Sequence, residues 1–294
     1  HNIEDEVSYR FVAYLIGLLL AFESMLLLAC CCVSIIYGER DLMSFIVSFA
    51  VCLSVSAILL VYGRRRKCAM SRNEGYIVVA LSWVFFSVFG MVPYLWGGFI
   101  PNITDAFFET MSGFTTTGAT ILDNIESMPH GILFWRSLTQ WIGGLGIVCF
   151  TIVLLPGFGA SSQMLYLSEA TGVTHNKLYP KTRVMARYIF MVYILLTAIE
   201  SALLMAGGMG LFDALCHSMT TTATGGFSTK QESIAYWHSP YMEYVVSIFM
   251  LLSAINFSLY IVAFKRKWKK PRESVDLKWV GCSVVLLTLV ISVV

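Results

Sequence analysis

Seven long apolar stretches restrict the possible folds of this 294-residue chain more than any other feature. They lie at roughly 10–37, 42–62, 76–98, 131–155, 184–206, 240–264 and 275–294. A helix of about 20 apolar residues is long enough to cross the hydrocarbon core of a bilayer. Hydrophobic residues make up 57% of the chain, charged residues only 13%, and the mean hydropathy is +0.73. Because these values lie outside the range of soluble domains, the sequence predicts an all-α polytopic membrane protein in contact with lipid.

The composition argues against two other classes of function. The net charge of +2 says little by itself, because the side of the membrane on which basic residues lie matters more than their sum, and we expect no nucleic-acid partner. The eight cysteines lie almost entirely inside the apolar stretches, without the spacing of a metal site. We interpret them as small packing residues rather than as disulfides or metal ligands.

A polar segment between apolar stretches occurs twice. Residues 105–120 and 213–228 share an Asp-Ala start, a Met, a run of Thr and a Thr-Gly ending, at a period of about 108 residues. A repeat of that length indicates a duplicated supersecondary unit. Each unit reads as an apolar span, a short helix, a Thr-Gly loop and a second apolar span.

The basic residues indicate how the chain crosses the membrane. The short segments 105–117 and 213–224 are too short to span a bilayer, so we expect each to enter the membrane and return to the same face. Three basic clusters then fall on one side, which the positive-inside rule assigns to the cytoplasm, together with the N-terminus. The clusters are Arg64–Lys67 with Arg72, then Lys177, Lys181 and Arg183, then Lys265–Lys267 with Lys269, Lys270 and Arg272.

The expected organisation has five parts. They are an N-terminal transmembrane hairpin (1–70), a first helix–pore loop–helix unit (71–156), a cytoplasmic connector (157–183), a second unit (184–270) and the first helix of a third unit (271–294). The tandem units resemble those of potassium channels, with the hairpin as an addition, and the sequence reads as truncated after two repeats.

The Thr-Gly loops have the chemistry of a cation filter. Such filters use backbone carbonyls in place of the ion's water, and glycine reaches the backbone angles that this requires. The preceding helix also directs its negative C-terminal end toward the cation. The candidate carbonyl donors are residues 115–118 and 222–225. Aligning the two Thr-Gly pairs gives an offset of 107 rather than 108, so Gly226 competes with Gly225 for the second key glycine.

Several alternatives concern the surroundings of these loops. The loops can also be read as simple tight turns between helices. The acidic residues Asp105, Glu109, Asp123 and Glu126 suggest a vestibule that attracts cations. Asp105 and Asp213 also fit helix N-caps.

Other polar or small residues inside apolar stretches call for their own interpretation. Asp213, His217 and Ser218 resemble a hydrolase grouping, which we discount because the first unit lacks the His. We expect Gly143, Gly144 and Gly146 to permit close helix packing. Glu23 and Glu200 are expected to face protein rather than lipid.

Three stretches together resemble a known family. They are Phe108–Thr120, Arg136–Gly146 and His217–Ser228 followed by Asn256–Ser258. These stretches resemble the TrkH membrane subunits of bacterial Trk potassium uptake systems, in the Trk/Ktr/HKT superfamily. The resemblance covers essentially the whole chain, including the opening hairpin.

The resemblance implies potassium uptake, passive or coupled to another ion, across the inner membrane and no enzymatic activity. It implies four units around one pore, a homodimer, and gating by a cytosolic RCK-type, nucleotide-binding TrkA subunit. Carried over by motif, the ligands of the transported K⁺ are the carbonyls of Thr116, Thr117 and Gly118 with Ala223, Thr224 and Gly225. Since later units are absent from this sequence, the alternative is a non-conducting fragment that acts as a membrane assembly module.

Overall fold

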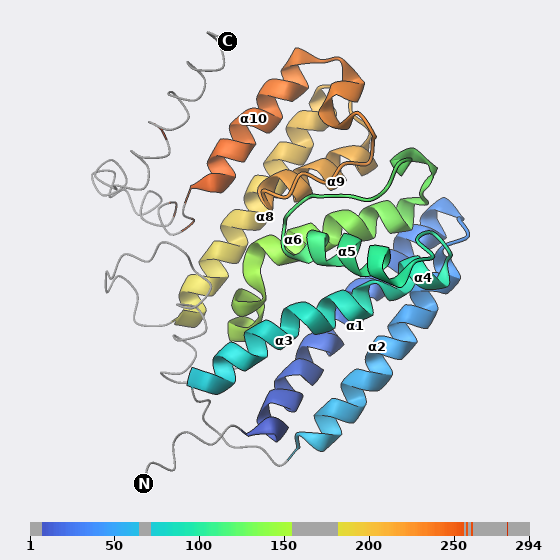
Figure 1. Cartoon of the computed structure of the whole chain (residues 1–294). Coiled ribbons are helices and arrows are strands. Elements are labelled where there is room, and N and C mark those ends of the chain that lie inside the picture. The colour runs from blue at the N-terminus through green and yellow to red at the C-terminus, as the bar shows by residue number, and fades with distance from the viewer. Residues whose placement is uncertain are drawn as a thin grey trace.

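The computed structural model describes residues 8–64, 72–154 and 182–255, together with residues 257, 260 and 281. Within these residues all regular secondary structure is helical, as the apolar stretches predict. Long helices run side by side, and the short helices α5 (Ile103–Phe114) and α9 (Leu211–Thr222) lie among them (Figure 1). The expected connector at 157–183 and the expected helix at 271–294 lie almost entirely outside the described residues.

The opening hairpin consists of α1 (Tyr9–Tyr37) and α2 (Leu42–Tyr62). Gly38 ends α1 in the left-handed conformation, with φ of 65°, and its N–H bonds to carbonyls of the last turn. The two helices pack closely, and the Ser56 hydroxyl donates to the Gly17 carbonyl at 2.6 Å. The described residues of this region therefore form two antiparallel helices in close contact.

The first unit contains two long helices with two short helices between them. In chain order its elements are α3 (Arg72–Gly90), α4 (Val92–Trp96), α5, the 3-10 turn η2 (Ile125–Ser127) and α6 (His130–Leu154). The predicted span 76–98 is thus divided after Gly90, where Pro93 occupies the first turn of α4. Gly146 interrupts α6, because its φ of 70° and ψ of 132° are not helical.

The second unit has the same order of elements, except that its described residues contain no counterpart of α4. It consists of α8 (Thr182–Ala206), α9, the 3-10 turn η3 (Ser233–Trp237) and α10 (Pro240–Ala254). α8, α9 and α10 all contact one another. The short helices α5 and α9 each begin two residues before the predicted segments and have 12 residues.

Four helical segments are long and apolar enough to cross a membrane within the described residues. They are Tyr9–Tyr37, Leu42–Tyr62, Glu74–Trp96 and Arg187–Ala206. α10 adds a shorter apolar helix. α6 contacts α1, α5, α8 and α9, so it joins the hairpin and both units.

Candidate functional site

The loops after α5 and α9 have the same backbone hydrogen bonds at an offset of 108 residues. Three N–H groups turn back onto the end of each short helix. The bonds are Thr115 N to Met111 O, Thr116 N to Gly113 O and Thr117 N to Ser112 O, and correspondingly Ala223 N to Met219 O, Thr224 N to Thr221 O and Gly225 N to Thr220 O. The three backbone hydrogen bonds of one loop thus correspond one by one to those of the other.

The same offset decides the register that the sequence left open. Thr116 and Gly118 have positive φ angles of 54° and 75°, and Thr224 and Gly226 have 56° and 87°. The structural equivalents of Thr116–Gly118 are therefore Thr224–Gly226. The expected set Ala223–Gly225 corresponds in its backbone hydrogen bonds to Thr115–Thr117.

Left-handed backbone at the two threonines is unusual. A β-branched residue with φ > 0 is a conformational outlier, and such outliers cost about 1–3 kcal/mol and persist only where the surroundings impose them. Thr117, between Thr116 and Gly118, does not have a positive φ. The sequence predicted unusual angles for glycine alone, and nothing in it indicated that Thr116 and Thr224 also adopt them.

The two loops meet at Gly118 and Gly225. A Cβ on Gly118 would collide with the carbonyl oxygen of Gly225, so a larger residue does not fit. A Cβ on Gly225 would collide with the side chain of Gln140. The loops also have exposed surface, since Thr115, Thr117, Thr224 and Gly226 are exposed.

Gln140 of α6 lies against both loops and is fully buried. Its Oε1 accepts from the Phe227 backbone N–H at 3.0 Å, just beyond the second loop. Its Nε2 has no hydrogen-bond partner among the described residues and lies near both glycines, 3.7 Å from a Cβ built on Gly118 and 2.8 Å from one built on Gly225. The amide therefore extends from a helix of the first unit to the loop of the second.

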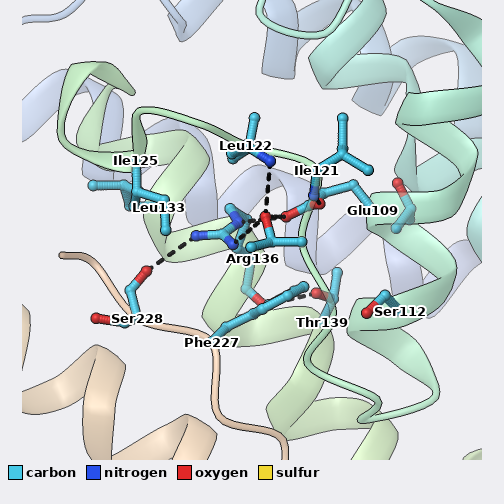
Figure 2. A network of polar contacts seen from close by, with 12 residues as sticks. Glu109, Ser112, Ile121, Leu122, Ile125, Leu133, Arg136, Thr139, Phe227 and Ser228 are labelled. Atoms are coloured by element: carbon cyan, nitrogen blue, oxygen red, sulfur yellow. Dashed lines mark hydrogen bonds and ion pairs between the residues drawn. The ribbon is translucent and has the colours of Figure 1, made fainter. Parts of the chain in front are cut away.

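Arg136 stands one helical turn before Gln140 and binds both units. Its Nε donates to Glu109 Oε1 at 2.9 Å, its Nη2 to Thr120 Oγ1 at 3.2 Å and its Nη1 to the Ser228 carbonyl at 3.0 Å. Figure 2 shows the guanidinium between Glu109 and Ser228, with the Phe227 ring beside it, 4.3 Å from Cζ to the ring centroid.

The pair formed by Arg136 and Glu109 is almost completely buried, with side-chain exposures of 1% and 0%. A buried ion pair gives little net stability over an apolar pair, but removal of one partner leaves an uncompensated charge. The hydrogen bonds to Thr120 and Ser228 give the guanidinium two further partners beside the carboxylate. The network thus fixes the geometry of the segments that follow both loops.

The segment after each loop is attached to its short helix by equivalent residues. Thr120 Oγ1 donates to Glu109 Oε1 at 2.9 Å, and Ser228 Oγ lies 3.2 Å from His217 Nε2. Each hydroxyl also accepts the backbone N–H two residues later. Both pairs are related by the 108-residue offset. The hydroxyl therefore bonds to the equivalent position of the short helix in each unit, although that position is a Glu in one and a His in the other.

The glycines of α6 bring this helix against the ends of both short helices. A Cβ on Gly143 would collide with the Phe114 carbonyl at the end of α5, and one on Gly144 would lie 2.8 Å from Ala223 Cα at the end of α9. The prediction that these glycines permit close packing is confirmed. Gly146 instead forms the kink of α6.

Two predictions about acidic residues are wrong. Glu109 does not belong to an exposed vestibule, because it is buried and paired with Arg136. Asp105 and Asp213 do not cap their helices, because the caps are Asn102 and Gly210. Both aspartates lie in the first turn, where a negative charge favours the helix dipole.

The remaining polar predictions have clear outcomes. The hydrolase grouping does not form, since Ser218 Oγ donates to the Leu215 carbonyl, His217 contacts Ser228, and Asp213 accepts from Thr229. Glu23 and Glu200 face protein, with 0% exposure each.

The described cysteines Cys30, Cys31, Cys32, Cys52 and Cys216 are all free. In the described part of the chain no group of three potential ligands could hold a metal ion.

Sequence reasoning missed the roles of Arg136 and Gln140. A charged residue inside an apolar stretch is itself a signal, because such residues are costly in a membrane. Their spacing of four residues, continued to Gly144, places all three on one face of α6. That pattern predicts a polar contact face, although it does not say what the face contacts.

The described helices are long and apolar enough to cross a membrane several times, and they hold two polar loops in contact with each other. These features are those of a polytopic helical membrane protein. The model of the family TrkH, described as a cation transport protein, matches residues 41–288. The chain therefore belongs to the TrkH family.

The comparisons with individual proteins agree. The chain is 35% identical over 293 residues to "Trk system potassium uptake protein TrkH" of Salmonella typhimurium, covering 97% of this chain and 60% of the relative. It is 34% identical over 286 residues to the corresponding TrkG protein of Escherichia coli, covering 95% and 59%. The crystal structure of the potassium transporter TrkH from Vibrio parahaemolyticus matches with a TM-score of 0.72 and 31% identity, over 88% of this chain and 53% of that one. The chain thus spans about three fifths of the curated relatives.

Proposed function

We propose that this chain forms two of the four sides of a potassium pore in the cell membrane and that K⁺ passes along the backbone of the two loops. The carbonyls of Thr116–Gly118 and Thr224–Gly226 would replace the water around the ion. One observation carries the proposal: two loops with the same hydrogen bonds and the same left-handed residues contact each other at Gly118 and Gly225. The identity of the ion is inferred from the names of the relatives, which are potassium uptake proteins.

The surroundings of the loops fit this function. α5 and α9 both end at the loops, so the negative ends of their dipoles favour a cation there. Arg136 has its charge neutralised by Glu109, which keeps a buried positive charge from opposing the ion. The exposed Asp123 and Glu126 still provide negative charge beyond the first loop.

Further features of the proposal come from the family resemblance. The remaining two sides would come from additional units, of which residues 271–294 would begin the third. A homodimer, gating by a cytosolic TrkA subunit, inner-membrane location and a cytoplasmic N-terminus are proposed on the same basis. The structure contributes the shared offset of 108 residues, which a pore of repeated units requires.

The test is rubidium tracer uptake into proteoliposomes, with potassium and sodium as competitors. We expect the protein expressed from its complete gene to take up rubidium, potassium to compete and sodium to compete weakly. The 294-residue chain alone is expected to show no uptake, because two sides do not enclose a pore. Uptake without potassium competition in the complete protein would contradict the proposal. Selective uptake by the short chain would show that two copies complete one pore.

A further inference from the structure

Gln140 of α6 is a buried polar side chain that is not explained by stability alone. It is 0% exposed. Its Oε1 faces the Phe227 backbone N–H at 3.0 Å, and this fixes the orientation of the amide, because a backbone N–H can only donate. The NH₂ group then points the other way, where Nε2 has no hydrogen-bond partner among the described residues. A buried donor without an acceptor lowers the stability of a protein, so another reason for an amide at this position is needed.

The amide lies directly behind the second loop. A Cβ built on Gly225 would collide with Cδ and Oε1 of Gln140 and would lie 2.8 Å from its Nε2. Gly225 does not have a positive φ, so its backbone angles do not themselves demand glycine. Glycine is therefore required at this position by the amide of Gln140, and the two residues form one packing unit.

The same amide reaches the contact between the two loops. A Cβ built on Gly118 would collide with the Gly225 carbonyl oxygen and would lie 3.7 Å from Gln140 Nε2. Gly225 thus has Gln140 beside its Cα and Gly118 beside its carbonyl. The bond from Phe227 to Oε1 holds the chain two residues after Gly225. Without the amide, the second loop would lose the contact that keeps it beside the first.

The neighbouring turns of α6 hold the segments on either side of this point. One turn before Gln140, Arg136 donates to the Ser228 carbonyl beyond the loop. One turn after it, a Cβ on Gly144 would lie 2.8 Å from Ala223 Cα, where α9 ends. Gln140 is the middle one of the three, and it faces the part of the loop that contains the proposed carbonyl ligands. A rigid helix that contacts a loop at three successive turns can fix its position closely.

We propose that Gln140 is a positioning residue that determines the discrimination between potassium and sodium. Its amide holds Gly225 against Gly118, and so it sets how far the carbonyls of the two loops lie from the ion. Carbonyls that are free to approach one another also accommodate the smaller sodium ion. This inference rests on the proposed function for its effect on the ion, but not for the packing of Gln140 against Gly225.

The packing is tested by thermal unfolding of the complete, purified protein in detergent. Gly225→Ala is expected to lower the unfolding midpoint by roughly 4 °C or more. In a Gln140→Ala background the same change should lower it by less than about half as much, because the shorter side chain leaves room for the methyl group. Thr139→Val is the control background, since Thr139 is also buried on α6 but its hydroxyl donates to the Arg136 carbonyl within the helix. An equal loss in all three backgrounds would overturn the proposal.

The discrimination is tested by sodium competition against rubidium uptake in proteoliposomes. Gln140→Met is expected to reduce discrimination by roughly tenfold, equivalent to about 1.4 kcal/mol. Its unfolding midpoint should change by less than about 4 °C, because an apolar side chain of similar length replaces the unpartnered donor. Gln140→Glu keeps an oxygen for the Phe227 N–H and should stay within about threefold of the wild type. Thr139→Val is expected to match the wild type.

Wild-type discrimination in Gln140→Met would overturn the proposal. A loss of discrimination that occurs only with a large loss of stability would also overturn it, since a purely structural residue has that effect. If Gln140→Met does not fold, Gly225→Ala probes the same contact from the other side, and wild-type discrimination in that variant would contradict the proposal. If the complete wild type shows no rubidium uptake that potassium inhibits, the proposed function fails, whereas the unfolding measurements still decide whether Gln140 packs against Gly225.

Discussion

At the scale of single residues, space and charge distinguish positions that look alike in the sequence. Gly118 and Gly226 have equivalent backbone angles, yet a Cβ on Gly226 meets nothing within 4 Å, whereas one on Gly118 meets the Gly225 carbonyl. Glu109 and Asp123 both look like outer-face acids, but Glu109 is buried in an ion pair. The residues to test first are therefore Gly118 and Glu109.

Gly118→Ser is expected to reduce discrimination between potassium and sodium by roughly tenfold or more. The new side chain both strains a left-handed backbone and displaces the Gly225 carbonyl, and about 1.4 kcal/mol is enough for a factor of ten. Sodium competition against rubidium uptake measures the effect. Gly98→Ser is the control, because Gly98 also has a positive φ, 67°, with nothing within 4 Å. Equal selectivity of both variants would contradict the role of Gly118.

Glu109→Gln is expected to destabilise the protein by about 3–5 kcal/mol, because it leaves the buried guanidinium of Arg136 uncompensated. The double variant Glu109→Leu with Arg136→Met should be more stable than Glu109→Gln, since it removes both charges. Thermal unfolding in detergent gives the order. A double variant less stable than the single one would show that the hydrogen bonds of Arg136 to Thr120 and Ser228 matter more than its charge.

At the scale of elements, α6 connects the parts of the molecule. One face carries Arg136, Gln140 and the two glycines, and the same helix contacts the hairpin and α8. Amphipathic patterning alone would assign this face to a generic protein contact. The positions of the two glycines on this face are explained by the fold, because the ends of α5 and α9 lie against them.

Gly143→Ala is expected to destabilise the protein by about 1–3 kcal/mol, the usual effect of overpacking, because the methyl group would displace the end of α5. Gly210→Ala at the start of α9 is the matched control, since Gly210 has a φ of −61° and open space around it. We expect that control to change stability by less than about 1 kcal/mol. Chemical denaturation monitored by tryptophan fluorescence compares the two, and equal effects would exclude a packing role for Gly143.

At the scale of the whole molecule, the charged residues at the two ends of the hairpin predict how the protein is oriented in the membrane. The helices and loops place Arg64, after α2, at the opposite end of the hairpin from the turn at Gly38. The turn lies beside the start of α6, where the Glu39 carboxylate contacts His130 at 2.8 Å. From the positive-inside rule we expect Arg64 to lie in the cytoplasm and the acidic segment containing Asp123 outside.

We therefore expect Asp123→Cys to react with a membrane-impermeant maleimide from outside, and Arg64→Cys to react only after the membrane is opened. Both positions are exposed in the structure, so accessibility within the protein does not limit either reaction. The unmodified chain, with its native cysteines, gives the background. Labelling of both variants from the same side would contradict the re-entrant reading of α5.

The sequence by itself determined the helical membrane class, the hairpin and the repeat of about 108 residues, because apolar length and repeated polar chemistry are local properties of a chain. It also placed Glu23 and Glu200 against protein, since acids in apolar stretches are too costly to face lipid. The tertiary structure alone decided the register of the second loop, the pairing of Glu109 with Arg136 and the contact of Gly118 with Gly225. These features depend on which atoms of distant segments meet, and a one-residue ambiguity between Gly225 and Gly226 can be resolved only by the backbone angles and hydrogen bonds that the folded units share.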